Sequence, residues 1–121
     1  MKKEAKEWLD KSIEDLETAK FNLNGNKYNF AIFLCQQSIE KALKAMQIEK
    51  LNKFDKTHDL TRLAKSINAP TEIINFCEDI SPYYTITRYP DIGESLNKAD
   101  AFSKMKKSEK VITWVKQNLN L

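Results

Sequence analysis

The chain has 121 residues, of which 41% are hydrophobic and 31% are charged. This balance excludes a membrane-embedded or intrinsically disordered chain, and the length suits one domain over residues 1–121. The formal net charge of +3 is smaller than a dedicated nucleic-acid binder usually carries. Only 2 Gly and 3 Pro are present, which disfavours an all-β fold because such a fold needs many turns.

Two long helices are predicted at the start of the chain. From Lys3 to Asn24 the apolar residues recur at three- and four-residue steps, which predicts an amphipathic helix. Asn24-Gly25-Asn26 should end it, because Gly and Asn tolerate the left-handed conformation found at helix ends. A second helix is predicted from Tyr28 to Glu49. Its apolar stripe is wide, so we expect it to lie centrally in the fold.

Shorter elements follow. Thr57 is expected to cap a short helix, and Thr71 the next one, which Pro82 should end near Ser81. The stretch from Thr85 to Glu94 is expected to be non-helical, and a last helix is predicted from Ser95 to Asn118. Together these elements predict an all-α fold, an antiparallel up-and-down four-helix bundle with one additional short helix.

Cysteine usage and the start of the chain indicate the compartment. Cys35 and Cys77 lie among apolar residues and form no CxxC pair, so we expect buried free thiols in a reducing environment. The N-terminus enters an amphipathic pattern directly, unlike a signal peptide, and no apolar run is long enough to span a membrane. A cytoplasmic protein without a membrane partner is predicted.

The segment Lys56-Thr57-His58-Asp59-Leu60 contains the single histidine. His58 is the side chain expected to titrate near neutral pH, and Asp59 is placed to orient it. An alternative is that Thr57 and Asp59 only start a helix. With one histidine and no clustered cysteines, no metal site and no cofactor are expected.

Two other segments carry candidate functional residues. In Thr87-Arg88-Tyr89-Pro90-Asp91, Arg88 can bind a phosphate or a carboxylate with two hydrogen bonds, Tyr89 can stack, and Asp91 can hold the arginine. Alternatively, Arg88 and Asp91 only pin a loop to the bundle. The polar run on the second helix either lines an interface or cleft or is a solvated helix face; its candidate residues are Gln36, Gln37, Glu40 and Lys41.

Taken together, these segments resemble the HEPN domain family, and the resemblance spans almost the whole chain. It depends on four blocks in order: Trp8-Leu9 with Asp15-Leu16 and Ala19, then the run from Phe33 to Ala45, then Lys56-Thr57-His58-Asp59-Leu60, then Thr87-Arg88-Tyr89-Pro90-Asp91.

The resemblance implies a helical bundle that forms a homodimer with a cleft between its subunits. It also implies a minimal nucleotidyltransferase as a partner, encoded beside it as a toxin–antitoxin pair. Many members of the family are metal-independent ribonucleases that use an Arg followed four to six residues later by His. Here Lys53 stands five residues before His58, and no histidine follows Arg88, so this motif is not intact.

Three functions therefore remain open. The first is a module that binds a nucleotide or RNA phosphate and acts with the nucleotidyltransferase; Lys56, Asp59, Arg88, Tyr89 and Asp91 would form its ligand site. The second is a metal-independent ribonuclease toxin whose catalytic residues at the dimer interface would be His58 and Arg88. The third is a purely structural interaction subunit.

Overall fold

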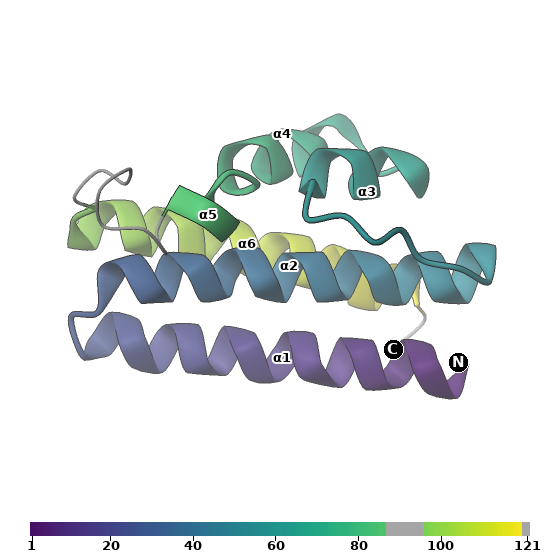
Figure 1. The fold of residues 1–121 in the computed structure, drawn as a ribbon, viewed down its shortest axis with the longest axis horizontal. Helices are drawn as coiled ribbons and strands as arrows, with labels where there is room; N and C mark the ends of the chain where they lie inside the picture. The colour runs from purple at the N-terminus through teal and green to yellow at the C-terminus, as the bar shows by residue number, and fades with distance from the viewer. Residues whose placement is uncertain (87–95, 120–121) are drawn as a thin grey trace.

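The computed structural model describes residues 1–86 and 96–119, and that part of the chain is all-α with no strand. Figure 1 shows α1 (Lys3–Asn24) running antiparallel to α2 (Tyr28–Leu51), with α6 (Lys98–Asn118) packed along α2 as the third long helix. The shorter α3 (Leu60–Ser66) and α4 (Thr71–Ile80) complete the bundle on the side of α2 away from α1. The predicted fold class is confirmed.

The central position predicted for the second helix is also found. α2 contacts each of the other helices, including the single-turn α5 (Tyr83–Ile86). It carries the longest series of buried residues in the described chain, from Ala31 to Ile48. Because the other helices all pack against α2, it fixes their positions relative to one another. The elements that form the candidate site are positioned by α2 in the same way.

Asparagines end the first two helices. α1 has the predicted bounds, and Asn26 rather than Gly25 takes the left-handed conformation there, with φ of 63°. α2 runs two residues beyond the predicted end at Glu49 and stops before Asn52, whose φ is 58°. Asn is the side chain that most readily takes this conformation after Gly.

The predicted caps of the two short helices are wrong by one or two residues. Asp59, not Thr57, is the N-cap of α3, and its carboxylate accepts a hydrogen bond from the Arg62 amide at 3.2 Å. The Thr57 hydroxyl instead accepts from the Asp59 amide at 3.1 Å. In α4 the N-cap position is Pro70, and Thr71 is the first helical residue.

The region around Pro82 also differs from the prediction. α4 ends at Ile80, close to the predicted stop. Thr85 was expected outside a helix, but it belongs to α5, because the Pro82 carbonyl accepts from the Thr85 amide and a new turn begins. The last helix starts at Lys98, behind the Asn97 cap, and not at Ser95, which lies outside the described residues.

The two longest helices approach closely at a pair of small polar residues. Ser12 on α1 and Ser38 on α2 are both fully buried. The Ser12 hydroxyl donates to the Ser38 carbonyl at 2.7 Å, and the Ser38 hydroxyl donates to the Ser12 carbonyl at 2.8 Å. Each hydroxyl therefore has a hydrogen-bond partner inside the core. Neither is left buried and unpaired, which would cost free energy.

Candidate functional site

The polar face of α2 is buried. Gln36 and Gln47 have no exposed surface, and Glu40 and Lys44 are each 5% exposed. Of the predicted candidate residues on this helix, Gln36 and Glu40 are therefore not solvated, whereas Gln37 and Lys41 are partly exposed. Figure 1 shows the connection between α2 and α3 running back along α2. Its backbone is hydrogen-bonded to two of the polar residues, Gln36 and Gln47.

Two glutamines fix this connection to α2. The Gln36 side-chain amide donates to the His58 carbonyl at 3.1 Å. Gln47 accepts from the Asp55 amide at 3.0 Å, and its own amide donates to the Asp55 carboxylate at 3.2 Å and to the Ser66 hydroxyl at 2.9 Å. The backbone on both sides of residues 56 and 57 is therefore anchored, and His58 is delivered to a defined place over α2.

His58 is exposed but held by a buried carboxylate. Its Nδ1 lies 2.7 Å from Glu40 Oε1; the His58 side chain is 54% exposed, whereas that of Glu40 is 6% exposed. Glu40 is in turn fixed by the Lys44 ammonium at 2.9 Å and by the Gln36 amide at 3.3 Å. We call His58, Glu40, Lys44 and Gln36 the His58 cluster.

Aromatic rings flank the His58 cluster on two sides. The Tyr84 ring of α5 stacks on the His58 imidazole, with centroids 4.6 Å apart and an angle of 26° between the planes. The Lys44 ammonium lies 5.7 Å from the ring centroids of both Trp8 and Phe54, which pack against each other at 5.0 Å. The cluster and its aromatic neighbours therefore come from α1, α2, α5 and the connection before α3.

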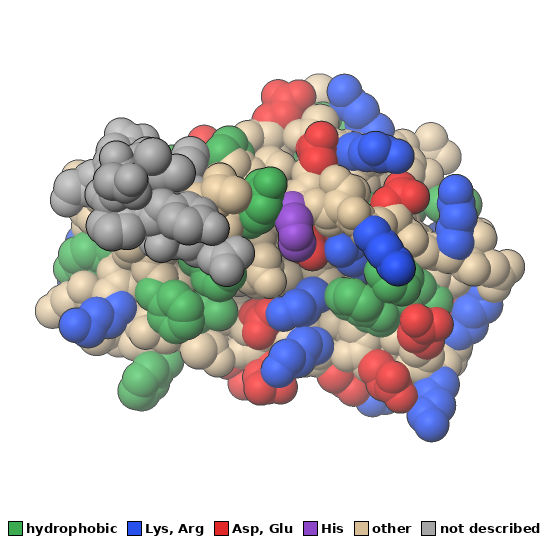
Figure 2. Space-filling view, in the orientation of Figure 1, with side chains coloured by type: hydrophobic (Ala, Val, Ile, Leu, Met, Phe, Trp, Pro, Cys, Tyr) green, Lys and Arg blue, Asp and Glu red, His purple; other side chains and the backbone are tan. Residues whose placement is uncertain are grey.

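The geometry sets what the imidazole can do. A carboxylate at Nδ1 favours a proton on that nitrogen, which leaves the Nε2 lone pair available in the neutral ring. Among the described residues Nε2 has no hydrogen-bond partner. Figure 2 shows the ring at the surface, with basic side chains on the same face of the molecule. Such an imidazole can accept a proton from a bound hydroxyl or, when protonated, donate to a phosphate oxygen.

The other predicted site residues of this region lie around the cluster. Lys56 is exposed and lines a surface hollow of ≈ 340 Å³ together with Lys2 and Lys53. Asp59 is engaged as the cap of α3, so Glu40 and not Asp59 is the carboxylate that orients His58.

Two predicted cleft residues on α2 have local partners. Gln37 donates to the Gln36 side-chain oxygen at 2.7 Å, and Lys41 pairs with Asp15 of α1. The structure thus brings Gln36 and Glu40 to His58, whereas Lys41 joins α2 to α1. The predicted residues Arg88, Tyr89 and Asp91 lie outside the described part of the chain.

Sequence reasoning missed Tyr84, Lys44 and Trp8 as members of the site. Lys44 had a visible signal, because it stands four residues after Glu40 and such a pair shares one helix face. Tyr84 gave no such signal, since it is separated from His58 by two helices.

Among the described residues no group of three or more His, Cys, Asp or Glu side chains is placed to hold a metal ion. Nor does any helix in the described part of the chain have the length and hydropathy needed to cross a bilayer.

Comparison with known proteins identifies the kind of domain. The family model described as "HEPN domain" matches residues 5–118. An archaeal HEPN homologue, ST0689, is 27% identical with a TM-score of 0.81, and the match covers 97% of this chain and 98% of that chain. No curated protein matches the chain.

Two further solved structures share the fold. TT1696 from Thermus thermophilus has a TM-score of 0.88 at 22% identity, with 96% of this chain and 98% of that chain covered. A HEPN domain protein from Thermotoga maritima, tm0613, has a TM-score of 0.77 at 22% identity, with 94% and 98% covered.

Proposed function

This chain belongs to the HEPN domain family, and from this premise we propose that it binds the phosphate groups of a nucleotide or an RNA strand at the His58 cluster. The observation that carries the proposal is a hydrogen bond that joins an exposed side chain to a buried one. A 54% exposed imidazole is held at 2.7 Å by a carboxylate whose side chain is 6% exposed. An exposed ring that is fixed in this way is positioned to contact a ligand that binds from solvent.

The surroundings of His58 suit a nucleotide. The Tyr84 ring already stacks on the imidazole, and an aromatic surface of this kind accepts a base of any sequence. Lys56, two residues before His58, shares its hollow with Lys2 and Lys53, and one acidic residue, Glu4, lines it as well. The positive excess there attracts phosphate without reading sequence.

Binding is tested by titrating a fluorescently labelled short RNA, and separately ATP, into the purified protein at several salt concentrations. We expect Lys56→Gln to weaken RNA binding and to reduce the salt slope by about 0.7, the value for one phosphate contact on a single strand. His58→Ala and Arg88→Ala should also weaken binding. Lys65→Gln removes the same charge from an exposed position on α3 and should leave the affinity unchanged. Absence of salt-dependent binding by the wild type would refute the proposal.

A metal-independent ribonuclease is the second candidate, and one observation favours it. The Glu40–His58 hydrogen bond leaves Nε2 as the free nitrogen, which is the arrangement that a general base needs to accept the proton of a ribose 2′-hydroxyl. Cleavage of RNA in the presence of EDTA, lost in His58→Ala and reduced in Glu40→Gln, would support it. Cleavage that persists in His58→Ala would point to a contaminant.

For partners, we propose a homodimer and a minimal nucleotidyltransferase, as the family resemblance implies. A dimer would cover large apolar side chains that the monomer leaves exposed, namely Phe21 at 78%, Phe30 at 50% and Phe102 at 53%. Light scattering on a size-exclusion column would give the mass in solution. Co-expression with a nucleotidyltransferase encoded beside this chain would show whether the two proteins co-purify, and free migration of both would refute the pairing.

A further inference from the structure

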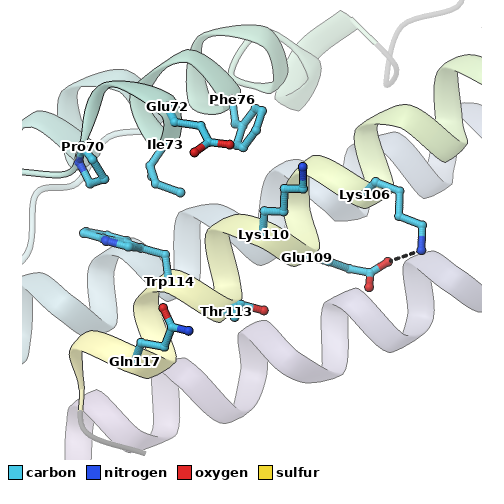
Figure 3. Close-up of a pocket in the computed structure, with 10 residues that line it drawn as sticks. All are labelled: Pro70, Glu72, Ile73, Phe76, Lys106, Glu109, Lys110, Thr113, Trp114 and Gln117. Carbon is cyan, nitrogen blue, oxygen red and sulfur yellow. Dashed lines mark ion pairs between the residues drawn. The ribbon is translucent and has the colours of Figure 1, made fainter.

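A second hollow lies between α4 and α6, and none of its lining residues belongs to the His58 cluster. Its volume is ≈ 490 Å³. Figure 3 shows Pro70, Ile73 and Phe76 on the α4 wall, facing Trp114 and Lys110 on the α6 wall. A volume in this range suits a small molecule, because ligand pockets usually measure about 300–1,000 Å³.

The floor of the hollow is apolar and aromatic. Ile73 is 6% exposed, and Phe76 and Trp114 are partly buried against the core. Figure 3 shows the indole of Trp114 on the opposite wall of the hollow from Pro70 and Ile73. An aromatic ring inserted there would stack on the indole and remove apolar surface on both walls from water.

Two exposed side chains of opposite charge, Lys110 and Glu72, stand on the two walls, and neither has an ionic partner in the part of the chain that the structure describes. The Lys110 ammonium lies 5.5 Å from the Phe76 ring centroid and forms no salt bridge with a described residue. Glu72, on the facing helix, likewise forms no salt bridge within the described chain. The other two charged residues of the hollow, Lys106 and Glu109, pair with each other at 3.7 Å.

We propose that this hollow binds a small zwitterion that carries an aromatic ring, the chemical class of the free aromatic amino acids. The ring stacks on Trp114, the carboxylate pairs with Lys110, and the ammonium group pairs with Glu72. A simple aromatic anion would leave Glu72 unpaired beside it, and an aromatic cation would leave Lys110 unpaired. The zwitterion is the class that uses both charges together with the aromatic floor.

The test is nuclear magnetic resonance of the Trp114 indole N–H group in the isotope-labelled full chain. The Trp8 indole, which packs against Phe54 and does not line this hollow, is an internal control, and a Trp8→Phe spectrum assigns the two signals. The probes are phenylalanine, phenylpropionate and phenethylamine, which share a ring but are zwitterionic, anionic and cationic. We expect phenylalanine to shift the Trp114 signal and not that of Trp8, with an affinity at least tenfold higher than either of the singly charged probes.

Variants separate the two charges. Lys110→Gln should abolish the tenfold preference over phenethylamine, and Glu72→Gln the preference over phenylpropionate, whereas Lys65→Gln should change neither. Three results would overturn the proposal: no shift with phenylalanine, equal binding of all three probes, or a Trp114 shift on raising the protein concentration alone. The last result would mean that a second copy of the chain occupies the hollow.

Discussion

At the scale of single residues, the Glu40–Lys44 pair has the least access to water of the ionic contacts between described residues. Its atoms are 2.9 Å apart, and each side chain is 6% exposed. Removing two charges from water costs free energy, which the attraction between them offsets only when both are present and hydrogen-bonded. The Lys44 ammonium also lies 5.7 Å from the rings of Trp8 and Phe54, and this contact adds a cation–π attraction.

Lys44→Met should therefore lower the free energy of unfolding strongly, by about 3–5 kcal/mol, because it leaves the Glu40 carboxylate buried without its cation. Adding Glu40→Gln should recover much of the loss, since the second change removes the charge. Urea denaturation measures both. Lys11→Met, which breaks an exposed pair with Glu14, is the control and should cost less than about 1 kcal/mol. A double variant no more stable than Lys44→Met would contradict this account.

The two cysteines are buried and free, as predicted from their apolar neighbours. Burial raises the pKa of the Cys35 thiol to about 11 and that of the Cys77 thiol to about 12. Since the thiolate is the reactive form, both should resist alkylation by iodoacetamide at pH 7 in the native protein. In urea both should react fully, and mass spectrometry counts the added groups. Rapid labelling of the native protein would show that one of the thiols is accessible.

At the scale of elements, the start of α6 depends on a reciprocal cap. The Asn97 side chain accepts from the Asp100 amide at 2.9 Å, and the Asp100 carboxylate accepts from the Asn97 amide at 3.2 Å. Asn97→Ala should destabilise the protein by about 0.5–2 kcal/mol, because it removes the acceptor for an amide that has no partner within the helix. Ser103→Ala, at an exposed site inside α6, is the control and should have little effect. Thermal unfolding compares the two variants, and equal midpoints would contradict the role of the cap.

The long helices were predictable because periodicity and end signals agreed. For α1 the apolar stripe and the Asn24-Gly25-Asn26 stop give the same boundary, which the structure has. The cap of α3 was mistaken because Thr57 and Asp59 are both good cap residues two positions apart, and α3 starts from the second. α5 was missed because Pro82 stops one helix and also suits the first turn of the next, a choice that local sequence does not decide.

At the scale of the whole molecule, the candidate site was predictable only in part. His58 and Glu40 were identified as candidates, but the sequence shows no relation between positions 40 and 58. Their contact exists because Gln36 and Gln47 hold the connection against α2, which is a tertiary effect. The same effect buries a polar helix face that periodicity alone assigns to solvent.

One carboxylate on α4 accepts hydrogen bonds from two lysines of α6. Asp79 of α4 accepts from the Lys107 ammonium at 2.8 Å and from the Lys104 ammonium at 2.9 Å. Partial burial pushes the pKa of Asp79 upward, but the hydrogen bonds from the two lysines outweigh this effect and hold the pKa below the usual value of 3.8. Folding therefore favours the ionised form of the Asp79 carboxyl group.

This shift makes the stabilisation by Asp79 depend on pH. Near and below pH 3.8 the unfolded chain binds a proton at Asp79 more readily than the folded chain, so stability falls as the pH falls. Asp79→Asn should thus be less stable than the wild type at pH 7, and the difference should hold down to about pH 5 and narrow towards pH 3. Urea unfolding at these three pH values measures it. Asp10→Asn, in an exposed pair with Lys6, should show a smaller difference throughout. A gap between wild type and Asp79→Asn that is as wide at pH 3 as at pH 7 would mean that the Asp79 charge does not join α4 to α6.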